Sequence, residues 1–340
     1  MIDFRYHLVS IVAVFLALAV GIVVGATALK PKTLQGLDSL SRREQHQINA
    51  QQTLITGLEH QVSSDEAAAK AAAPLVLNNL LAGQRVVLVT APNSDPTTIS
   101  GVTTALQQAG AKVTGQAELQ PAFFDTSAST EKNLETLAQH VAPPGVTPGI
   151  QSGQPDGNTQ IAGQQEAAQV LAAALVTKVG DLPAQQAKPI IDGFAAQRFL
   201  QMSFAGGSAV PSQATLAVVI IPASPPASAS DPLNLALISL AAQLKASSHG
   251  VVLAGSILGS GPGSAVDELI NGSTGVQLSS VNNADTEVGQ IFVAQALNLA
   301  LTGPKAGAYG VPPGAAPSPA PTPTATPTPT RPPAKNKSGG

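Results

Sequence analysis

Residues 8–29 read LVSIVAVFLALAVGIVVGATAL, and this stretch decides the organisation of the chain because it contains no charged residue. At 1.5 Å per residue, a helix of about 22 residues is about 33 Å long, enough to cross a hydrocarbon core of about 30 Å. A lone segment satisfies its backbone polar groups in lipid only as a helix. The stretch therefore predicts one transmembrane helix in contact with membrane lipid, after a short flank over residues 1–7.

A cleaved signal peptide is the alternative interpretation of the same stretch. Ala26-Thr27-Ala28 has the small-x-small pattern of a cleavage site, and Arg5 supplies a basic start. The apolar run is longer than a signal core of 7–15 residues, and a helical pattern continues shortly after it, which favours a retained anchor. Cleavage after Ala28 stays open. The flanking charges, Arg5 against Lys30 and Lys32, mildly favour a cytoplasmic C-terminal side and do not determine the orientation.

Small residues recur at every fourth position of the predicted anchor, at Ala13, Ala17, Gly21 and Gly25. This spacing lays a flat stripe along one helix face, as in closely packed transmembrane dimers. The alternative is that Ala and Gly are simply common in this chain. The stripe indicates that the anchor contributes to a homodimer or a higher oligomer.

Residues 30–82 predict a helical stalk with a heptad pattern. Position a carries Leu34, Ser41, Ile48, Ile55 and Val62, and position d carries Leu37, Glu44, Gln51, Leu58 and Asp65. The a positions are mostly apolar and the d positions are not, so the pattern predicts a short, imperfect coiled coil in a homodimer. A single amphipathic helix packed on its own domain is the alternative. Pro74 is expected to interrupt or restart the helix, and Gly83 to end it.

Residues 84–303 predict a soluble α/β domain. Buried strands are expected at 85–90, 112–119, 214–221 and 251–256, and helices at 98–109, 131–141, 161–177, 190–201, 233–246 and 286–301. Strands that alternate with helices form a mainly parallel sheet with helices on both faces. The predicted fold is therefore a three-layer, Rossmann- or flavodoxin-like domain.

Residues 304–340 form a Pro/Thr/Ala-rich tail, with ten prolines between positions 311 and 334. Such a composition cannot bury a core and favours extended polyproline II, so a disordered tail or spacer is expected.

The overall composition excludes several function classes. The formal net charge of −3 gives no electrostatic reason to expect nucleic acid as a partner. The chain has no Cys, which excludes disulfides, thiolate metal sites and thiol catalysis.

Two glycine-containing stretches resemble known catalytic or binding loops only in part. The loop Gly259–Gly263 follows a predicted strand and precedes a helix, but its spacing differs from the phosphate-binding fingerprints and Pro262 lacks an N–H group, so a plain turn is expected. Residues 206–210, GGSAV, miss the nucleophile-elbow pattern at the last residue. No catalytic residue and no cofactor are predicted, and the chain is not expected to be an enzyme.

Potential metal ligands are sparse, and no ligand set is predicted. The five histidines, His7, His46, His60, His140 and His249, form no close pair. His46 and His60 share heptad position f but lie about 21 Å apart along a helix, so they cannot bind one ion within a chain. Met202 is the single methionine besides Met1, so soft sulfur ligands for Cu(I) are nearly absent. Asp267 and Glu268 are neighbours that diverge on a helix and are interpreted as solvated.

The opening MIDFRYHLVSIVAVFLALAVGIVVGA, followed by a polar helix and an RVVLVTAP strand, resembles the actinobacterial copper transporter family of MctB-type proteins. VNNADTEVGQ at 281–290 and AGAYG at 306–310 are similar to that family's C-terminal motifs. The resemblance implies a cell-envelope protein of copper efflux and copper homeostasis, described as a channel, with copper as its ion. It also implies a domain outside the cytoplasm, and outer-membrane placement is compatible with the resemblance.

One helix cannot enclose a pore, and an outer-membrane barrel needs alternating strands of about ten residues with aromatic girdles. Two hypotheses therefore remain. The chain takes part in copper export, or it is a bitopic coiled-coil scaffold that presents an α/β interaction domain to an envelope protein partner.

Overall fold

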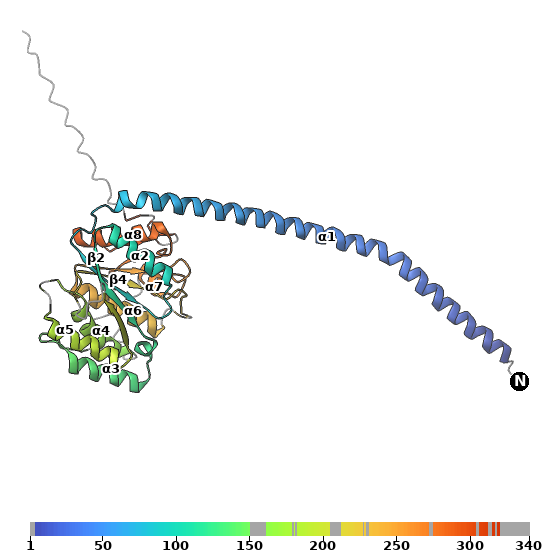
Figure 1. Ribbon diagram of the computed structural model, residues 1–340. Coiled ribbons are helices and arrows are strands. Elements are labelled where there is room, and N and C mark those ends of the chain that lie inside the picture. Colours follow the sequence, from blue (N-terminus) through green and yellow to red (C-terminus); the bar gives the residue numbers. More distant parts are fainter. Residues whose placement is uncertain are drawn as a thin grey trace, which may run out of the picture. The chain divides into compact units, whose positions relative to one another are not determined.

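The computed structural model describes residues 4–149, 161–178, 180, 182–204, 212–226, 228, 231–271, 275–303, 306–311, 315, 316, 318 and 319, with backbone alone at 4, 5, 27–41 and 184. The chain divides into two compact units, Met1–Asp65 and Glu66–Gly340. Figure 1 shows its elements.

The first unit consists of the helix α1, which runs over Phe4–Leu77 and continues into the second unit. Its segment Tyr6–Ala26 is long and apolar enough to cross a membrane, as the sequence predicts. The helix continues through Pro74, where an interruption was expected. Pro74 lies on the exposed side of the last turn, so the carbonyl that loses its N–H partner can bind water instead. The helix ends at Leu77, and Gly83, at φ 77°, lies in the turn before the first strand.

The second unit contains a seven-stranded sheet in the order β3-β2-β1-β4-β5-β6-β7. The strands are β1 (Arg85–Thr90), β2 (Lys112–Leu119), β3 (Leu200–Phe204), β4 (Leu216–Ile220), β5 (Gly250–Ala254), β6 (Ser279–Val281) and β7 (Ala308–Tyr309). All neighbouring strands pair in parallel except β2 and β3, which are antiparallel. A parallel-dominated sheet confirms the predicted α/β class.

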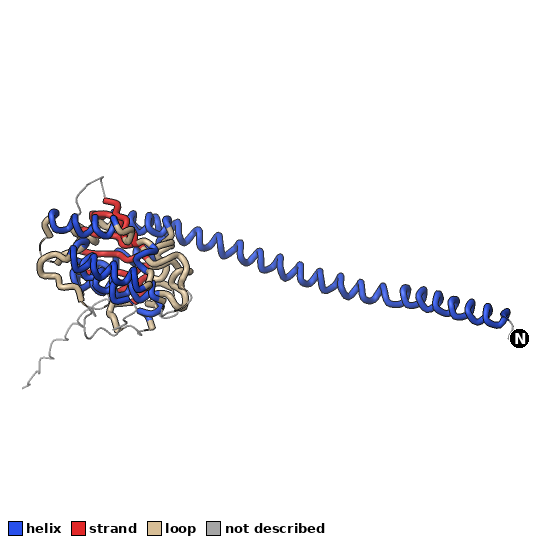
Figure 2. Tube along the Cα trace, turned by 90° about the horizontal axis from the view of Figure 1, so that it is seen from below, coloured by secondary structure: helices blue, strands red, loops and turns tan. Residues whose placement is uncertain are grey.

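Helices cover both faces of this sheet and make three layers (Figures 1 and 2). One face carries α2 (Pro96–Gln108), α8 (Glu287–Thr302) and the end of α1. The other carries α3 (Ala128–Val141), α4 (Ala162–Leu175), α5 (Ala184–Ala196), α6 (Pro232–Ser247) and α7 (Ala265–Ile270), with a 3₁₀ turn η1 (Pro121–Phe124) after β2.

Two clusters of buried apolar side chains, one on each face of the sheet, explain which helix lies on which face. Because side chains alternate along a strand, Val86 and Leu88 of β1 point to the α2–α8 layer, whereas Val87 and Val89 point to the opposite layer. β4 and β5 are buried along their whole length, as expected for central parallel strands.

The predicted helix at 190–201 is wrong in its second half. Helix α5 ends at Ala196, Arg198 takes a left-handed conformation at φ 60°, and Leu200–Phe204 form β3. The antiparallel pairing of β3 with β2 is a tertiary interaction that outweighs the local helical pattern.

Most of the predicted tail lies outside the described residues. Its beginning belongs to the sheet, because β7 pairs with β6 and Ala316 forms a bridge with Tyr309. The predicted domain boundaries at 7, 29, 82 and 303 stay predictions.

Candidate functional site

Sheet topology indicates where a ligand site is expected. In a doubly wound sheet, ligands bind beyond the carboxyl ends of the strands where the strand order reverses. Here β1 lies between β2 and β4, so the reversal lies at the carboxyl ends of β1 and β4. The segment after β1, residues 91–96, reads APNSDP and contains no glycine.

Hydrogen bonds close the crevice between these two strand ends. The N–H of Ala91 donates to the carbonyl of Ile220 at 2.9 Å, and the N–H of Ala223 donates to the carbonyl of Asn93 at 3.0 Å. The Oγ of Ser94 lies 2.9 Å from the carbonyl oxygen of Ala91 and 3.1 Å from that of Ile221. The backbone groups at these strand ends are thus hydrogen-bonded to other groups of the same chain.

The N-terminus of α2, the usual phosphate position after β1, is occupied by the Asp95 carboxylate. Oδ2 of Asp95 accepts hydrogen bonds from the hydroxyl of Thr97 and from the N–H and hydroxyl of Thr98, the latter two at 2.8 Å. These bonds, with that from Thr97 the strongest, lower the pKa of Asp95 to about 2. Pro96 supplies no N–H group, so this helix start has neither the charge nor the free donors for a phosphate.

Three other helices that start near this edge of the sheet are also capped by side chains at their own N-termini. Asp231 accepts from the N–H of Leu233 at 2.9 Å at the start of α6. Ser264 accepts from the N–H of Asp267 at 3.1 Å at the start of α7. Thr286 accepts from the N–H of Gly289 at 3.0 Å at the start of α8. An anion would have to displace these oxygens.

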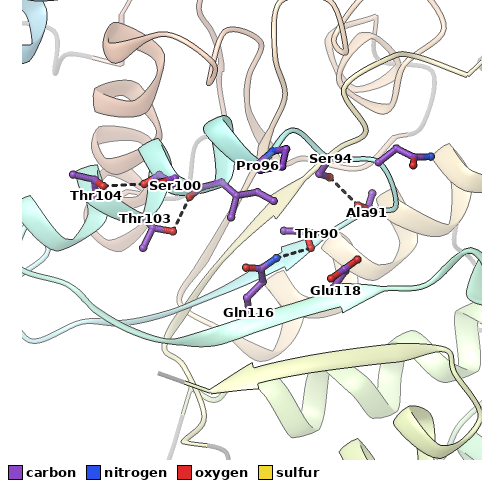
Figure 3. Close-up of a pocket in the computed structure, with 11 residues that line it drawn as sticks. Thr90, Ala91, Ser94, Pro96, Ser100, Thr103, Thr104, Gln116 and Glu118 are labelled. Carbon is purple, nitrogen blue, oxygen red and sulfur yellow. Dashed lines mark hydrogen bonds between the residues drawn. The ribbon is translucent and has the colours of Figure 1, made fainter. Parts of the chain in front are cut away.

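A cavity of about 530 Å³ lies open beside α2, over the carboxyl ends of β1 and β2 (Figure 3). Its lining is mostly hydroxyl and amide groups with one carboxylate: Thr90, Ala91, Asn93, Ser94, Pro96, Ile99, Ser100, Thr103, Thr104, Gln116 and Glu118. We take this cavity as the candidate site and call it the α2 cavity.

Strand alternation places the two side chains of β2 that line the α2 cavity. Ala117 and Leu119 point into the core on the opposite face of the sheet, so Gln116 and Glu118 point to the α2 side. The sequence analysis did not select Gln116 or Glu118. The alternation of polar residues at 114, 116 and 118 with Gly115, Ala117 and Leu119 was the signal that could have found them.

The loop Gly259–Gly263 does not have the open conformation of a phosphate-binding loop. A Cβ at Gly259 would overlap the carbonyl oxygen of Pro222, and the N–H of Gly263 donates to Oδ2 of Asp267 at 3.0 Å. Asp267 is therefore not simply solvated, in contrast to the expectation. Residues 206–210, which were compared with the nucleophile-elbow pattern, lie outside the described residues.

Among the described residues, no three His, Asp or Glu side chains come together as a group that could hold a metal ion. His46 and His60 are exposed on α1. His249 precedes β5 at the opposite, amino edge of the sheet. None of the described histidines is among the residues that line the α2 cavity.

Comparison with known proteins gives one consistent result. Residues 1–319 match the family described as copper transport outer membrane protein, MctB. A copper transporter MctB from Mycobacterium leprae is 28% identical over 328 residues, which cover 93% of this chain and 98% of the relative. A copper transporter MctB from Mycobacterium tuberculosis H37Rv is 30% identical over 145 residues, which cover 43% of this chain and 46% of the relative. This chain therefore belongs to the MctB family of copper transport outer membrane proteins.

Proposed function

We propose that this chain is a non-enzymatic, membrane-anchored component of copper export in the cell envelope, and that it acts by engaging other proteins. The observation that carries the proposal is the family match, which runs from residue 1 to residue 319 and so includes the anchor, the stalk and the α/β domain. The relatives are named copper transporters, and a shared arrangement of all three parts favours a shared role in copper homeostasis.

Engagement of other proteins explains the architecture better than conduction by this chain alone. The segment Tyr6–Ala26 is a single apolar span, and one helix encloses no pore. Several copies would line a pore with apolar side chains, which offer an ion no replacement for its water. A scaffold needs only the anchor, the helix α1 and a folded domain.

The self-capped helix starts support a role without catalysis. At the carboxyl edge of the sheet, the oxygens of Asp95, Asp231 and Thr286 take the positions that cofactor phosphates occupy in doubly wound enzymes. Copper would then be moved by a partner, with this chain holding that partner in place.

The stalk supports a parallel homodimer. Its apolar heptad residues Ile48, Ile55, Leu58 and Val62 are all exposed in the single chain. Two copies anchored in one membrane by the same helix have these positions in register, and burial of each such side chain contributes about 1.5–3 kcal/mol.

We further propose that the α/β domain lies outside the cytoplasm. The family description places its members in the outer membrane, which favours an envelope location for the domain. The charges that flank the anchor are too few to outweigh this.

Copper content of cells tests the proposal. In a strain that lacks its own copy of this protein, the full chain should restore low intracellular copper and growth on copper. The double variant Leu16→Arg, Val20→Arg puts two charges in the span, at a cost of about 2.5–3.5 kcal/mol each, and should fail to restore either. The control Leu16→Ile, Val20→Ile should behave as the unchanged chain.

Conductance separates the scaffold from a channel. The purified chain in planar bilayers should leave the conductance at its baseline in copper solution. Copper-dependent conductance would show that the chain is a channel and would contradict the scaffold proposal. If the full chain left the copper content of the complemented strain unchanged, the proposed role in copper homeostasis would be wrong.

A further inference from the structure

We propose that the α2 cavity binds ligands that carry a protonated amine or a guanidinium group, such as a basic side chain or a small polyamine. This binding activity is independent of the proposed role in copper export. The cavity offers a ligand negative charge together with unused hydrogen-bond acceptors.

Two threonine hydroxyls of α2 that line the cavity have already used their donors. Thr103 donates to the carbonyl of Ile99 at 2.7 Å, and Thr104 donates to the carbonyl of Ser100 at 2.9 Å (Figure 3). A hydroxyl has one donor and two lone pairs, so each of these groups can only accept from a ligand. The hydroxyl of Ser94 can also only accept from a ligand, because its one hydrogen is shared by three backbone carbonyls within hydrogen-bond distance.

The floor of the cavity adds acceptors and the negative charge. Nε2 of Gln116 donates to Oγ1 of Thr90 at 3.3 Å, which leaves the Oε1 of Gln116 as an acceptor. No residue that the structure describes bonds to the half-buried Glu118 carboxylate, which accepts only. Figure 3 shows Gln116 and Glu118 side by side on β2, below α2.

These groups select against anions. The lining contains no Lys, Arg or His, and the Asp95 carboxylate adds a second negative charge at the start of α2. A phosphate would meet the like charge of the Glu118 and Asp95 carboxylates. A neutral sugar would find hydrogen-bonding groups but would leave the charge of Glu118 unpaired.

A protonated amine or guanidinium matches both features. An ammonium group has three donors and a guanidinium five, none of which needs an acceptor lone pair of its own. A hydrogen bond to a charged group is stronger than one between neutral groups. The volume of about 530 Å³ lies within the usual range for small-molecule sites and admits a chain of several atoms with its water.

Calorimetric titration with agmatine, which carries an amine and a guanidinium, tests the proposal. The full chain in phosphatidylcholine nanodiscs should bind agmatine with a Kd on the order of 1 mM, equivalent to about −4 kcal/mol. Empty nanodiscs supply the blank. The uncharged 1,4-butanediol and inorganic phosphate should give no binding at the same concentrations.

Two variants locate the binding. Glu118→Gln keeps the size of the side chain and should weaken agmatine binding at least tenfold, and Thr104→Tyr should fill the cavity and weaken it as much. Glu135→Gln, on the exposed surface of α3, is the matched control and should leave the affinity unchanged. Melting followed by circular dichroism checks that all three variants fold.

The proposal fails if the unchanged chain does not bind agmatine, if folded Glu118→Gln binds it equally well, or if butanediol binds as tightly. Each of these results leaves the copper content of complemented cells unaffected, so the proposed function is judged separately.

Discussion

The side-chain amide of Asn282 forms two hydrogen bonds with the backbone of Val311. Nδ2 of Asn282 donates to the carbonyl of Val311 at 2.8 Å, and Oδ1 accepts from the N–H of Val311 at 2.8 Å. Asn282 follows β6 and Val311 follows β7, so the amide continues the sheet for one more residue. The two C-terminal stretches that carried the family resemblance are therefore parts of one structural unit.

Asn282→Ala should release β7 from the sheet. The substitution removes two hydrogen bonds, each worth about 0.5–1.5 kcal/mol, so we expect a loss of about 1–2 kcal/mol in unfolding free energy. Amide hydrogen exchange at Gly310 and Val311 should accelerate. Asn133→Ala, on the exposed face of α3, is the control and should change neither quantity. Unchanged exchange at Val311 in the Asn282 variant would show that β7 is held by other contacts.

Gly289→Ala should be far more damaging. Gly289 lies in the first turn of α8, and a Cβ there would overlap the backbone carbonyl of Asn283, which cannot move without disturbing the turn after β6. We expect a loss of about 3 kcal/mol or more. At Gly303, the nearest atom to an added Cβ is the carbonyl oxygen of Leu299 at 3.8 Å, so Gly303→Ala should cost little. Equal melting temperatures for the two variants would contradict this account of the turn.

The strands of the sheet differ in how well the sequence alone could predict them. The apolar runs of β1, β4 and β5 are strong local signals for central strands, and their alternation with helices predicts the three layers. β6 has three residues and β7 two, and the Asn282 amide helps to hold them together. β3 has five residues, as β4 and β5 do, but forms through its antiparallel pairing with β2. The local sequence pattern does not show these tertiary neighbours.

The α2 cavity could not be predicted for a related reason. Thr103 and Thr104 are ordinary helix residues in the sequence, and only the fold places them over Glu118. The cap at Asp95 was in principle readable, because an Asp before a Pro at the start of a helix is a recognised start signal.

Acid should remove the contribution of Asp95. The pKa of Asp95 is about 2 in the folded chain, below its usual value near 3.8. Its contribution to the free energy of unfolding is therefore present above pH 4 and is lost as the pH falls toward 2. The group is partly exposed, so solvent screening limits the effect, and we expect Asp95→Ala to cost about 1 kcal/mol at pH 7. The stability difference between Asp95→Ala and the unchanged chain should shrink between pH 4 and pH 2. The surface variant Asp192→Ala is the control, and its free energy of unfolding at each pH should be close to that of the unchanged chain. A difference for Asp95→Ala that stays constant with pH would exclude the charged cap.

Single cysteines can test the stalk dimer cleanly, because the chain has no Cys of its own. Ile55 is at heptad position a, where paired Cα atoms in a parallel dimer lie within the reach of a disulfide, about 4.4–6.8 Å. Ile55→Cys in membranes should form a cross-linked dimer on mild oxidation. His60→Cys, at the outer position f, is the control and should stay monomeric under the same conditions. Equal cross-linking of the two would argue for random collision in place of a coiled coil.

Cysteine labelling also tests the orientation. Gln52→Cys on α1 and Lys132→Cys on α3 place a thiol on exposed residues of each unit. A membrane-impermeant maleimide should label both in intact cells whose outer layers have been made permeable. Asp3→Cys, before the span, should react only after the membrane is dissolved. The reverse pattern would place the α/β domain in the cytoplasm.

The central claim is that Tyr6–Ala26 stays in the bilayer as one helix while the α/β domain stays in water. Its most direct test is fractionation after lysis without detergent, followed by a carbonate wash and intact-mass measurement. We predict that the chain remains in the membrane pellet with its N-terminal residues present. Recovery of the chain from the aqueous fraction with residues 6–26 still attached would contradict the claim.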